Sequence, residues 1–338
     1  MRMCLICRRR NIDYYGICAD CQKMNDEMRG LSCDLTGLTA VVTGGRIKIG
    51  YAVCLRLLRQ GARVIAVTRY PQTALENYSN ESDFQDFKDR LTIIGFDLIR
   101  VDRMIDLIAE IERLCGGRLD ILVNNAAQTV KKSNSHYAEL AAHENSLALE
   151  SPALIPLGTA ADSSAVMPSI RQTDYGETEN DNSWVRKPES ISPQELLEVQ
   201  LINVTAPFML TNGLRRCLAN GVSENRFVIN VSSAEGRFNQ RQKLARHVHT
   251  NMAKASLNMM THSIAMDFAG DNIYVYSCDP GWVSNQFPPD YEISKSFKPY
   301  LTFDDGASRV LYPITKNLHE SKIKDSGLFY KDYRIIDY

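Results

Sequence analysis

The sequence has no long apolar run, no excess of either charge and no apolar leader. None of its apolar runs reaches about 18 residues, the length at which a transmembrane helix is expected. Its 39 basic and 40 acidic residues leave a formal net charge of −1, which indicates neither a nucleic-acid partner nor a membrane partner. The segment from Met1 to Arg10 lacks the apolar core of a signal peptide. These absences predict a soluble, cytoplasmic protein.

The size and composition are those of an ordinary globular protein. With 338 residues, 44% of them hydrophobic and 23% charged, the chain can bury one large α/β core and a small appendage. Its cysteines number 9 and are spread along the chain. In an intracellular protein they are expected to be reduced thiols or metal ligands rather than disulfides.

Four of the cysteines form two close pairs near the N-terminus, Cys4 with Cys7 and Cys18 with Cys21. Each pair can form a tight turn that offers two sulfurs to one ion, and four thiolates suit tetrahedral zinc. Four protein ligands leave no open coordination position, so a structural Zn²⁺ is predicted rather than a catalytic one. The alternative is a cysteine-rich tail without metal.

The segment that carries these cysteines has too few large apolar residues for a core of its own. A bound metal would supply the missing folding free energy. The polar stretch 25–34 that follows is interpreted as a linker. The predicted organisation is a zinc module and linker at 1–34 and a main domain at 35–338.

The main domain is organised around a strand, a glycine-rich turn and a helix. The apolar run 38–43 ends in glycines, and apolar residues return at helical spacing over 50–58. This arrangement aims backbone N–H groups and a helix N-terminus at a phosphate, so the chain is predicted to bind a nucleotide. The nucleotide-binding candidates in this stretch are Thr43, Gly44, Gly45, Arg46, Lys48, Ile49 and Gly50.

Strand and helix patterns alternate through the rest of the main domain. Short apolar runs bounded by turn residues predict strands, and an apolar stripe at 101–115 predicts an amphipathic helix. Alternation at this pitch favours an α/β fold with a doubly wound parallel sheet. Further strands are expected at 63–68, 91–96, 119–123, 227–231, 272–278 and 327–330, and further helices at 84–89, 193–217, 250–268 and 302–318.

Two motifs together resemble the short-chain dehydrogenase/reductase family. Thr43-Gly44 with Gly50 is similar to its Thr-Gly-x-x-x-Gly-x-Gly loop, and 124–127 reads Asn-Asn-Ala-Ala where the family has Asn-Asn-Ala-Gly. Lys48 stands at the family's middle glycine. The resemblance covers about residue 35 to the C-terminus and implies a Rossmann fold and an oxidoreductase activity that uses a nicotinamide dinucleotide.

The cofactor can be chosen from charge. An acidic residue after the second strand would bind the ribose 2′-hydroxyl of NAD, whereas an arginine suits the 2′-phosphate of NADP. Here Thr68-Arg69 follows that strand, and Arg46 and Lys48 add cations nearby. NADP(H) is therefore predicted, the alternative being that Arg69 is a solvated surface residue. The resemblance further implies that Asp97 meets the adenine ring and that Asn124, Asn125 and Ala126 line the ribose and nicotinamide.

The segment between Asn124 and Asn203 is much longer than this family normally has there. Residues 131–192 are polar and show no sustained periodicity, apart from one short helix expected at 138–149. Long loops in compact domains are usually lids, binding surfaces or disordered segments. The insertion is interpreted first as a lid or partner surface over the active site and second as a mobile insert.

The resemblance also implies catalytic positions in the second half of the chain. Asn203 matches the family's helix asparagine, which holds a water in the proton relay, and Ser233 matches its substrate-polarising serine. Lys254 matches the lysine of its Tyr-x-x-x-Lys pair, but the tyrosine position holds Thr250. An aliphatic hydroxyl is far too weak an acid to replace a phenol near neutral pH. Pro280 and Gly281 match the turn beside the nicotinamide, and 284–298 matches the segment that closes over substrate.

Three interpretations of the missing tyrosine are open. His249 or His247 could donate the proton, because imidazole titrates near neutrality. A tyrosine from elsewhere, such as Tyr137, could take its place. The site could instead bind NADP without reducing a substrate. Lys254 is expected to bind the ribose in each case.

The predicted function is hydride transfer between NADP(H) and a small carbonyl, alcohol or imine substrate, with a non-standard proton donor. The alternative is a catalytically silent NADP-binding scaffold whose zinc module and insertion recruit a protein partner. A homo-oligomer, dimer or tetramer, is implied by the resemblance through the helices at 193–217 and 250–268.

Overall fold

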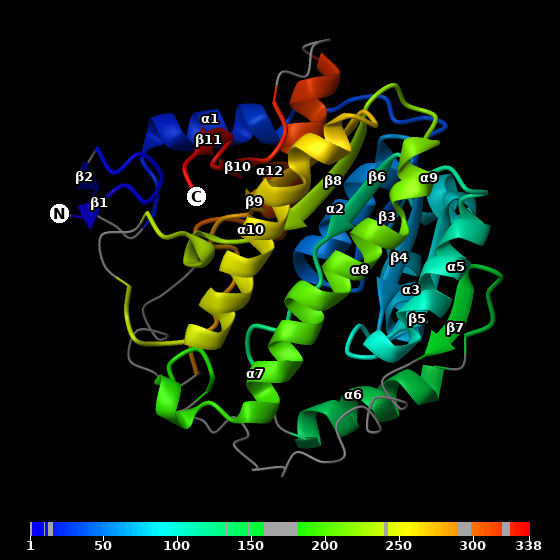
Figure 1. Ribbon diagram of the computed structural model, residues 1–338, viewed down its shortest axis with the longest axis horizontal. Coiled ribbons are helices and arrows are strands. Elements are labelled where there is room, and N and C mark those ends of the chain that lie inside the picture. The colour runs from blue at the N-terminus through cyan, green and yellow to red at the C-terminus, as the bar shows by residue number, and fades with distance from the viewer. Residues whose placement is uncertain are drawn as a thin grey trace.

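A computed structural model describes residues 2–9, 11–12, 16–132, 134–147, 149–158, 182–239, 243–288, 299–319 and 325–338. Within them, a large sheet has the strand order β11–β10–β9–β8–β6–β3–β4–β5–β7 (Figure 1). All its neighbouring strands are parallel except β10 and β11. The strands are β3 (Thr39–Thr43), β4 (Arg63–Thr68), β5 (Leu91–Phe96), β6 (Ile121–Asn124), β7 (Leu154–Gly158), β8 (Arg226–Val231), β9 (Ile273–Asp279), β10 (Leu328–Lys331) and β11 (Arg334–Ile336).

Helices cover both faces of this sheet, as the doubly wound prediction requires. Side chains alternate along each strand, so Ala40 and Val42 of β3 enter one core while Val41 enters the other. The first core contains α2 (Lys48–Arg59), α3 (Pro71–Ser79) and α12 (Phe303–His319). The second contains α5 (Met104–Leu114), α8 (Ala206–Gly213), α9 (Arg215–Ala219) and the end of α10 (Val248–Ala269).

Most predicted elements lie where they were expected. β4 and β5 have the predicted bounds, and the other predicted strands agree to within one or two residues. The predicted helix 84–89 is α4 (Phe84–Phe87), and α3 before it was missed. The predicted helix 193–217 is interrupted, because α7 (Pro193–Gln200) continues through a π-helical turn at Leu201–Thr205 into α8. No helix among the described residues combines the length and apolar character that crossing a membrane requires.

The N-terminal segment packs against the C-terminal part of the main domain. It contains a short hairpin, β1 (Arg2–Met3) with β2 (Asn11–Ile12), and α1 (Ala19–Arg29), which lies along α12. Interpreting 25–34 as a linker was therefore wrong for its first half. Asn25 is buried and donates a hydrogen bond of 2.7 Å to Asp305, and Arg29 pairs with the same carboxylate at 2.8 Å. Asn25 and Arg29 therefore anchor α1 to α12 through a buried polar contact.

The insertion adds two ordered elements to the fold, α6 (Asn134–Leu147) and β7. The predicted helix at 138–149 thus begins and ends earlier. β7 was missed because Pro156 argues against a strand, yet β7 is the outermost strand, where proline is tolerated. It pairs in parallel with β5, with Ile94 opposite Ile155. The middle of the insertion, 159–181, lies outside the described residues.

Candidate functional site

A cavity of about 410 Å³ lies at the carboxyl ends of the parallel strands, where α/β sheets bind their ligands. It begins at the glycine loop after β3, passes the ends of β4 and β5, and reaches the residues after β6 and after β9. The predicted cofactor-binding residues that line it are Gly44, Arg46, Lys48, Ile49, Gly50, Arg69, Asp97, Asn125 and Ala126.

The glycine loop brings the backbone close to the turn after β6. A Cβ atom on Gly50 would collide with the Gly44 carbonyl oxygen and with the Asn125 amide, so this position has no room for a side chain. Gly44 has a φ of 75°, which only glycine adopts without strain. Thr43 Oγ1 accepts the N–H groups of Asn125 and Ala126, each at 3.0 Å. Thr43 therefore holds the two motifs together from behind the cavity.

Two other predicted cofactor residues serve the scaffold around the cavity. Gly45 has its carbonyl bound by the Tyr78 hydroxyl at 2.5 Å. Asn124 is buried, and its amide donates to Asn230 Oδ1 at 2.8 Å and to Thr211 Oγ1 at 3.1 Å. It thus ties β6 to β8 and α8, and the expected ribose contact at this position stays a prediction.

Lys48 has a left-handed backbone, with a φ of 57°. This explains why the related family has glycine at this position, since a side chain there costs about 1–2 kcal/mol. The lysine brings a cation to the rim of the cavity in exchange for that strain. Burial, together with the neighbouring Lys132 and Arg46, lowers the pKa of Lys48.

The cavity is bordered by a group of cations: Arg46, Lys48, Arg69 and Lys132. Burial lowers the pKa of Arg46, and the charge of Arg69 lowers it further. The pKa of Arg69 is raised instead, because the carboxylate of Asp97 and nearby tyrosines outweigh its burial. Cations that repel one another around a glycine-rich cradle are complementary to phosphate groups. The residues present therefore fit a phosphorylated dinucleotide.

Two of the predicted catalytic residues, Ser233 and Lys254, lie at the carboxyl end of β8. Ser233 follows β8 and its Oγ accepts the Glu235 N–H at 3.1 Å, which begins a short 3₁₀ turn. Lys254 on α10 is buried, and its Nζ donates to the Val231 carbonyl at 2.7 Å. Burial lowers the pKa of Lys254 to about 8, although Asp279 partly opposes this. Thr250 lies one turn earlier on α10, and its buried Oγ1 has no hydrogen-bond partner among the described residues.

Asn203, the next predicted catalytic residue, is bound to a residue that lines the cavity. Its amide donates to the Gln128 carbonyl at 2.9 Å and accepts the Gln128 N–H at 2.7 Å. Gln128 lines the cavity, and Asn203 lies in the π-helical turn between α7 and α8. π-Helical turns are frequent at functional sites because they reorient a side chain within a helix.

Sequence reasoning missed Asp279, which joins two of the predicted motifs. Its Oδ2 accepts the Ala234 N–H at 2.8 Å, next to Ser233, and its Oδ1 accepts the Gly281 N–H at 2.8 Å. Lys331 of β10 neutralises it at 2.8 Å. An acidic residue at the buried end of β9, directly before Pro280, was the signal available in the sequence.

The turn at Pro280 and Gly281 is covered by residue 301. Gly281 has a φ of 81°, and a Cβ atom there would lie 2.5 Å from Leu301 Cδ1. Ser284 and Gln286 continue from this turn into the cavity lining. Residues 289–298 of the predicted closing segment lie outside the described residues.

The two histidines considered as proton donors lie at the start of α10. His249 is 2% exposed, and its Nε2 lies 3.6 Å from Glu195 Oε1. His247 stacks on Trp184, with ring centroids 4.1 Å apart, and its Nδ1 lies 2.9 Å from the Trp184 carbonyl. Both rings are thus packed against other side chains in the protein interior.

Tyr137 lies at the opposite end of the site from Lys254. Its ring is 5.5 Å from the Arg69 guanidinium, after β4, whereas Lys254 lies beside the end of β8. Three strand spacings separate β4 from β8, or about 14 Å. The structure therefore does not bring Tyr137 to the predicted catalytic residues.

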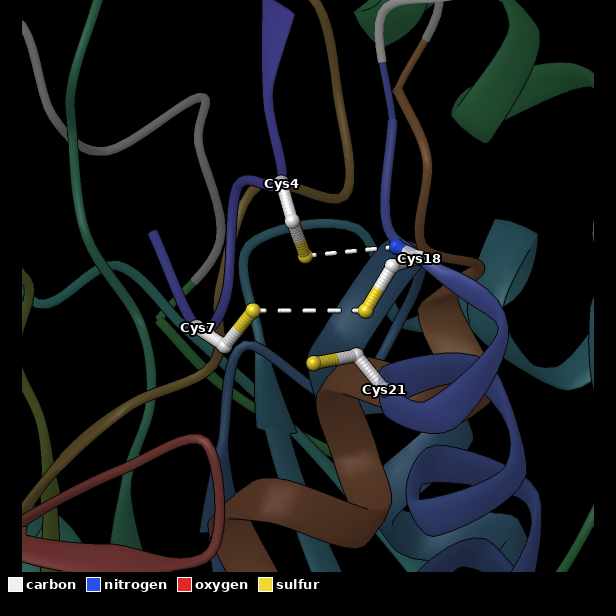
Figure 2. A group of neighbouring side chains, drawn as sticks. All are labelled: Cys4, Cys7, Cys18 and Cys21. Carbon is white, nitrogen blue, oxygen red and sulfur yellow. Dashed lines mark hydrogen bonds between the residues drawn. The ribbon is translucent and has the colours of Figure 1, made fainter. Parts of the chain in front are cut away.

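The four paired cysteines form one cluster (Figure 2). Their Sγ atoms all lie within 4.8 Å of one another, and Cys7 and Cys18 are 3.9 Å apart. Tetrahedral zinc with four sulfurs at about 2.3 Å places the sulfurs about 3.8 Å apart, so the cluster fits that ion. The Cys18 N–H donates to Cys4 Sγ at 3.2 Å, which would support a thiolate. Tyr300 packs against this cluster from the main domain.

A doubly wound parallel sheet with a glycine loop and a phosphate-compatible cavity at the carboxyl ends of its strands defines a Rossmann-type dinucleotide-binding protein. The family model described as "short chain dehydrogenase" matches residues 38–157, and a model described as "Enoyl-(Acyl carrier protein) reductase" matches residues 182–299. The chain belongs to the short-chain dehydrogenase/reductase family.

Three known proteins illustrate this relationship. "Uncharacterized protein R665" of Acanthamoeba polyphaga mimivirus is 32% identical over 341 residues, which cover 93% of this chain and 71% of that protein. The NADPH-bound carbonyl reductase from chicken fatty liver is 18% identical with a TM-score of 0.62, covering 93% of this chain and 98% of that one. The angucycline C-6 ketoreductase LanV with bound NADP is 20% identical with a TM-score of 0.60, covering 89% and 96%. The two structural likenesses show the fold alone.

Proposed function

We propose that the protein is an NADP(H)-dependent oxidoreductase that transfers a hydride between the cofactor and a carbonyl, alcohol or imine substrate. The observation that carries this proposal is the group of cations, Arg46, Lys48 and Arg69, beside the glycine loop. Such a group complements a 2′-phosphate, which NAD lacks. The bound NADPH and NADP in two proteins of similar fold support the same choice.

Lys254 is the proposed proton donor in place of the missing tyrosine. Burial brings its pKa to about 8, in the range where an ammonium is an efficient general acid near neutral pH. When bound, the cofactor supplies the hydride. Ser233 would polarise the substrate oxygen, and Lys254 would give that oxygen a proton from Nζ and regain one from solvent. Asn203 would act by positioning Gln128.

The second candidate is a cofactor-binding scaffold without turnover. Thr250 cannot act as an acid near neutrality, although it stands where the family has its catalytic tyrosine. Under this hypothesis the zinc module and the insertion would bind a protein partner. The protein would then hold NADP(H) tightly and consume none.

Replacing Ser233 by alanine distinguishes these functions. We expect the wild-type protein to consume NADPH with some members of a panel of ketones, aldehydes and imines, and Ser233→Ala to be at least about 100-fold slower, because one oxyanion donor is worth that much. Ser232→Ala is the matched control, since its hydroxyl contacts the Lys254 carbonyl at 3.5 Å instead. NADPH binding without consumption by the wild type would favour the scaffold, and equal rates for Ser233→Ala and the wild type would contradict the site.

We also propose that the four cysteines bind one structural Zn²⁺.

We further propose that the protein is a homo-oligomer. Met252, Met259 and Met266 recur every seventh residue on α10 and are 50%, 60% and 82% exposed. Phe208 on the adjacent α8 is 52% exposed. These helices lie side by side in front of the sheet (Figure 1), which supports an interface between two copies. Light scattering measures the mass, and a monomer at micromolar concentration would contradict this proposal.

A further inference from the structure

The insertion helix α6 forms one wall of the cofactor cavity. His136, Tyr137 and Leu140 of this helix line the cavity together with the glycine loop and the residues after β4. Lys132, just before α6, lines it as well. Figure 1 shows α6 below the ends of β4 and β5, separate from the helices that cover the two faces of the sheet. The insertion thus reaches the end of the cavity where Arg69 lies.

A buried carboxylate holds α6 in this place. Glu144 accepts the Gln72 N–H at 2.6 Å and the N–H and hydroxyl of Thr73 at 2.8 and 2.6 Å, so it caps the N-terminus of α3. A negative charge at a helix N-terminus is stabilising. The Gln72 amide also bonds the Leu149 N–H and carbonyl at 2.8 and 3.2 Å. These hydrogen bonds tie α6 and Leu149 to the start of α3, so the side chains of α6 face the cavity from a defined position.

Tyr137 contacts the guanidinium group of one arginine and the backbone of Lys132. The Arg69 guanidinium lies 5.5 Å from the Tyr137 ring and 5.6 Å from the Tyr70 ring, so it is held between two aromatic side chains. The Tyr137 hydroxyl accepts the Lys132 N–H at 3.2 Å. Arg46 contacts the Tyr70 ring from the glycine-loop side at 5.0 Å. The two tyrosine rings thereby lie against the guanidinium groups of Arg69 and Arg46.

We infer that Tyr137 is a specificity-determining residue that, with Tyr70, positions Arg69 for the 2′-phosphate of the cofactor. The insertion helix is then part of the cofactor site. This inference rests on the proposed function, because it assigns a role in selecting NADPH over NADH. Those cofactors differ only in the 2′-phosphate, so a contact that acts through Arg69 affects one and spares the other.

The affinities of Tyr137→Leu and Tyr137→Phe for NADPH and NADH test this inference. Loss of the ring from the Arg69 contact is expected to weaken NADPH binding about 10-fold and NADH binding less than about 2-fold, in line with a cation–π contact in a partly buried site. Tyr137→Phe keeps the ring and is expected to stay within about 2-fold of wild type for both cofactors. Titration of intrinsic and cofactor fluorescence gives the four dissociation constants.

Glu139→Leu is the matched control, since Glu139 is an exposed residue of the same helix. It should leave both affinities unchanged. If Tyr137→Leu weakens both cofactors equally or neither, or if Tyr137→Phe loses as much as Tyr137→Leu, the inference is overturned while the proposed function stands. If the wild-type protein binds neither NADPH nor NADH, the proposed function is itself overturned.

Discussion

Cys18→Ser is expected to lose the proposed Zn²⁺ and to lower the thermal unfolding midpoint of the whole chain by about 5 °C. A structural zinc site in a small module contributes about 10–16 kcal/mol of apparent binding free energy, which is largely folding free energy. Without it, the segment that contains α1 has a small apolar core that includes Ile17 and the cysteines themselves. Part of the loss reaches the main domain, because Asn25, Arg29 and Tyr300 pack across the boundary.

Metal content and calorimetry of two variants measure this effect. Cys33→Ser is the control, because Cys33 lies outside the cluster and its Sγ donates to Gln60 Oε1 at 3.2 Å. We expect one zinc per chain in the wild type and in Cys33→Ser, and almost none in Cys18→Ser. Equal, near-zero zinc content in all three proteins would contradict the proposal that the cysteines bind a metal. An unchanged midpoint in a zinc-free Cys18→Ser would show that the module is independent of the main domain.

Lys254→Met is expected to slow NADPH consumption by at least about 100-fold and to make the folded protein more stable at pH 7. Burial lowers the pKa of this lysine from its model-peptide value of 10.5 to about 8. A shift of that size corresponds to a cost of about 3 kcal/mol for keeping the ammonium charged inside the protein. Methionine has a similar shape and no charge, so this cost disappears together with the proposed proton donor. The loss of the hydrogen bond to the Val231 carbonyl, worth about 1 kcal/mol, offsets only part of that gain.

The pH dependence of the same variants separates proton donation from charge. The unfolded chain keeps the Lys254 proton up to about pH 10.5, and the folded chain loses it near pH 8, so the stability of the wild type rises with pH between these values relative to Lys254→Met. Activity moves in the opposite direction and falls above pH 8. Lys254→Arg keeps the charge at every accessible pH and should bind NADPH without reducing substrate. Near-normal turnover by Lys254→Arg would show that the charge alone matters.

The parts of the fold that the sequence predicts well are those decided by neighbouring residues. β4 and β5 are continuous apolar runs because both of their faces are buried, and polar or turn residues mark their ends. β7 has no such signal, because its pairing with β5 connects segments about 60 residues apart and Pro156 interrupts its pattern. The docking of α1 depends on Asp305, which lies 280 residues after Asn25. No local pattern reports such a contact.

The candidate site divides in the same way. The glycine loop and Arg69 are local motifs, and the structure places them on one cavity. Asp279 and Tyr137 acquire their roles from contacts with elements far along the chain, at Ala234 and Arg69. The proposed proton donor is the part that local sequence defines least. The property that distinguishes Lys254 is its burial, and that burial is set by the packing of α10 on β8 and β9.

The contact of α1 with α12 also sets an order of events during synthesis. Cys4 to Cys21 leave the ribosome before α12 does, and their thiolates can bind a metal ion from that point on. The carboxylate that receives Asn25 and Arg29 is made 280 residues later, roughly half a minute at about 10 residues per second. Throughout that interval α1 lacks its contacts with α12 and has those with α2, such as the 2.9 Å hydrogen bond from Arg56 to the Arg29 carbonyl. The docking of α1 is therefore completed only after α12 has been made, and it reports that the nascent chain has reached α12.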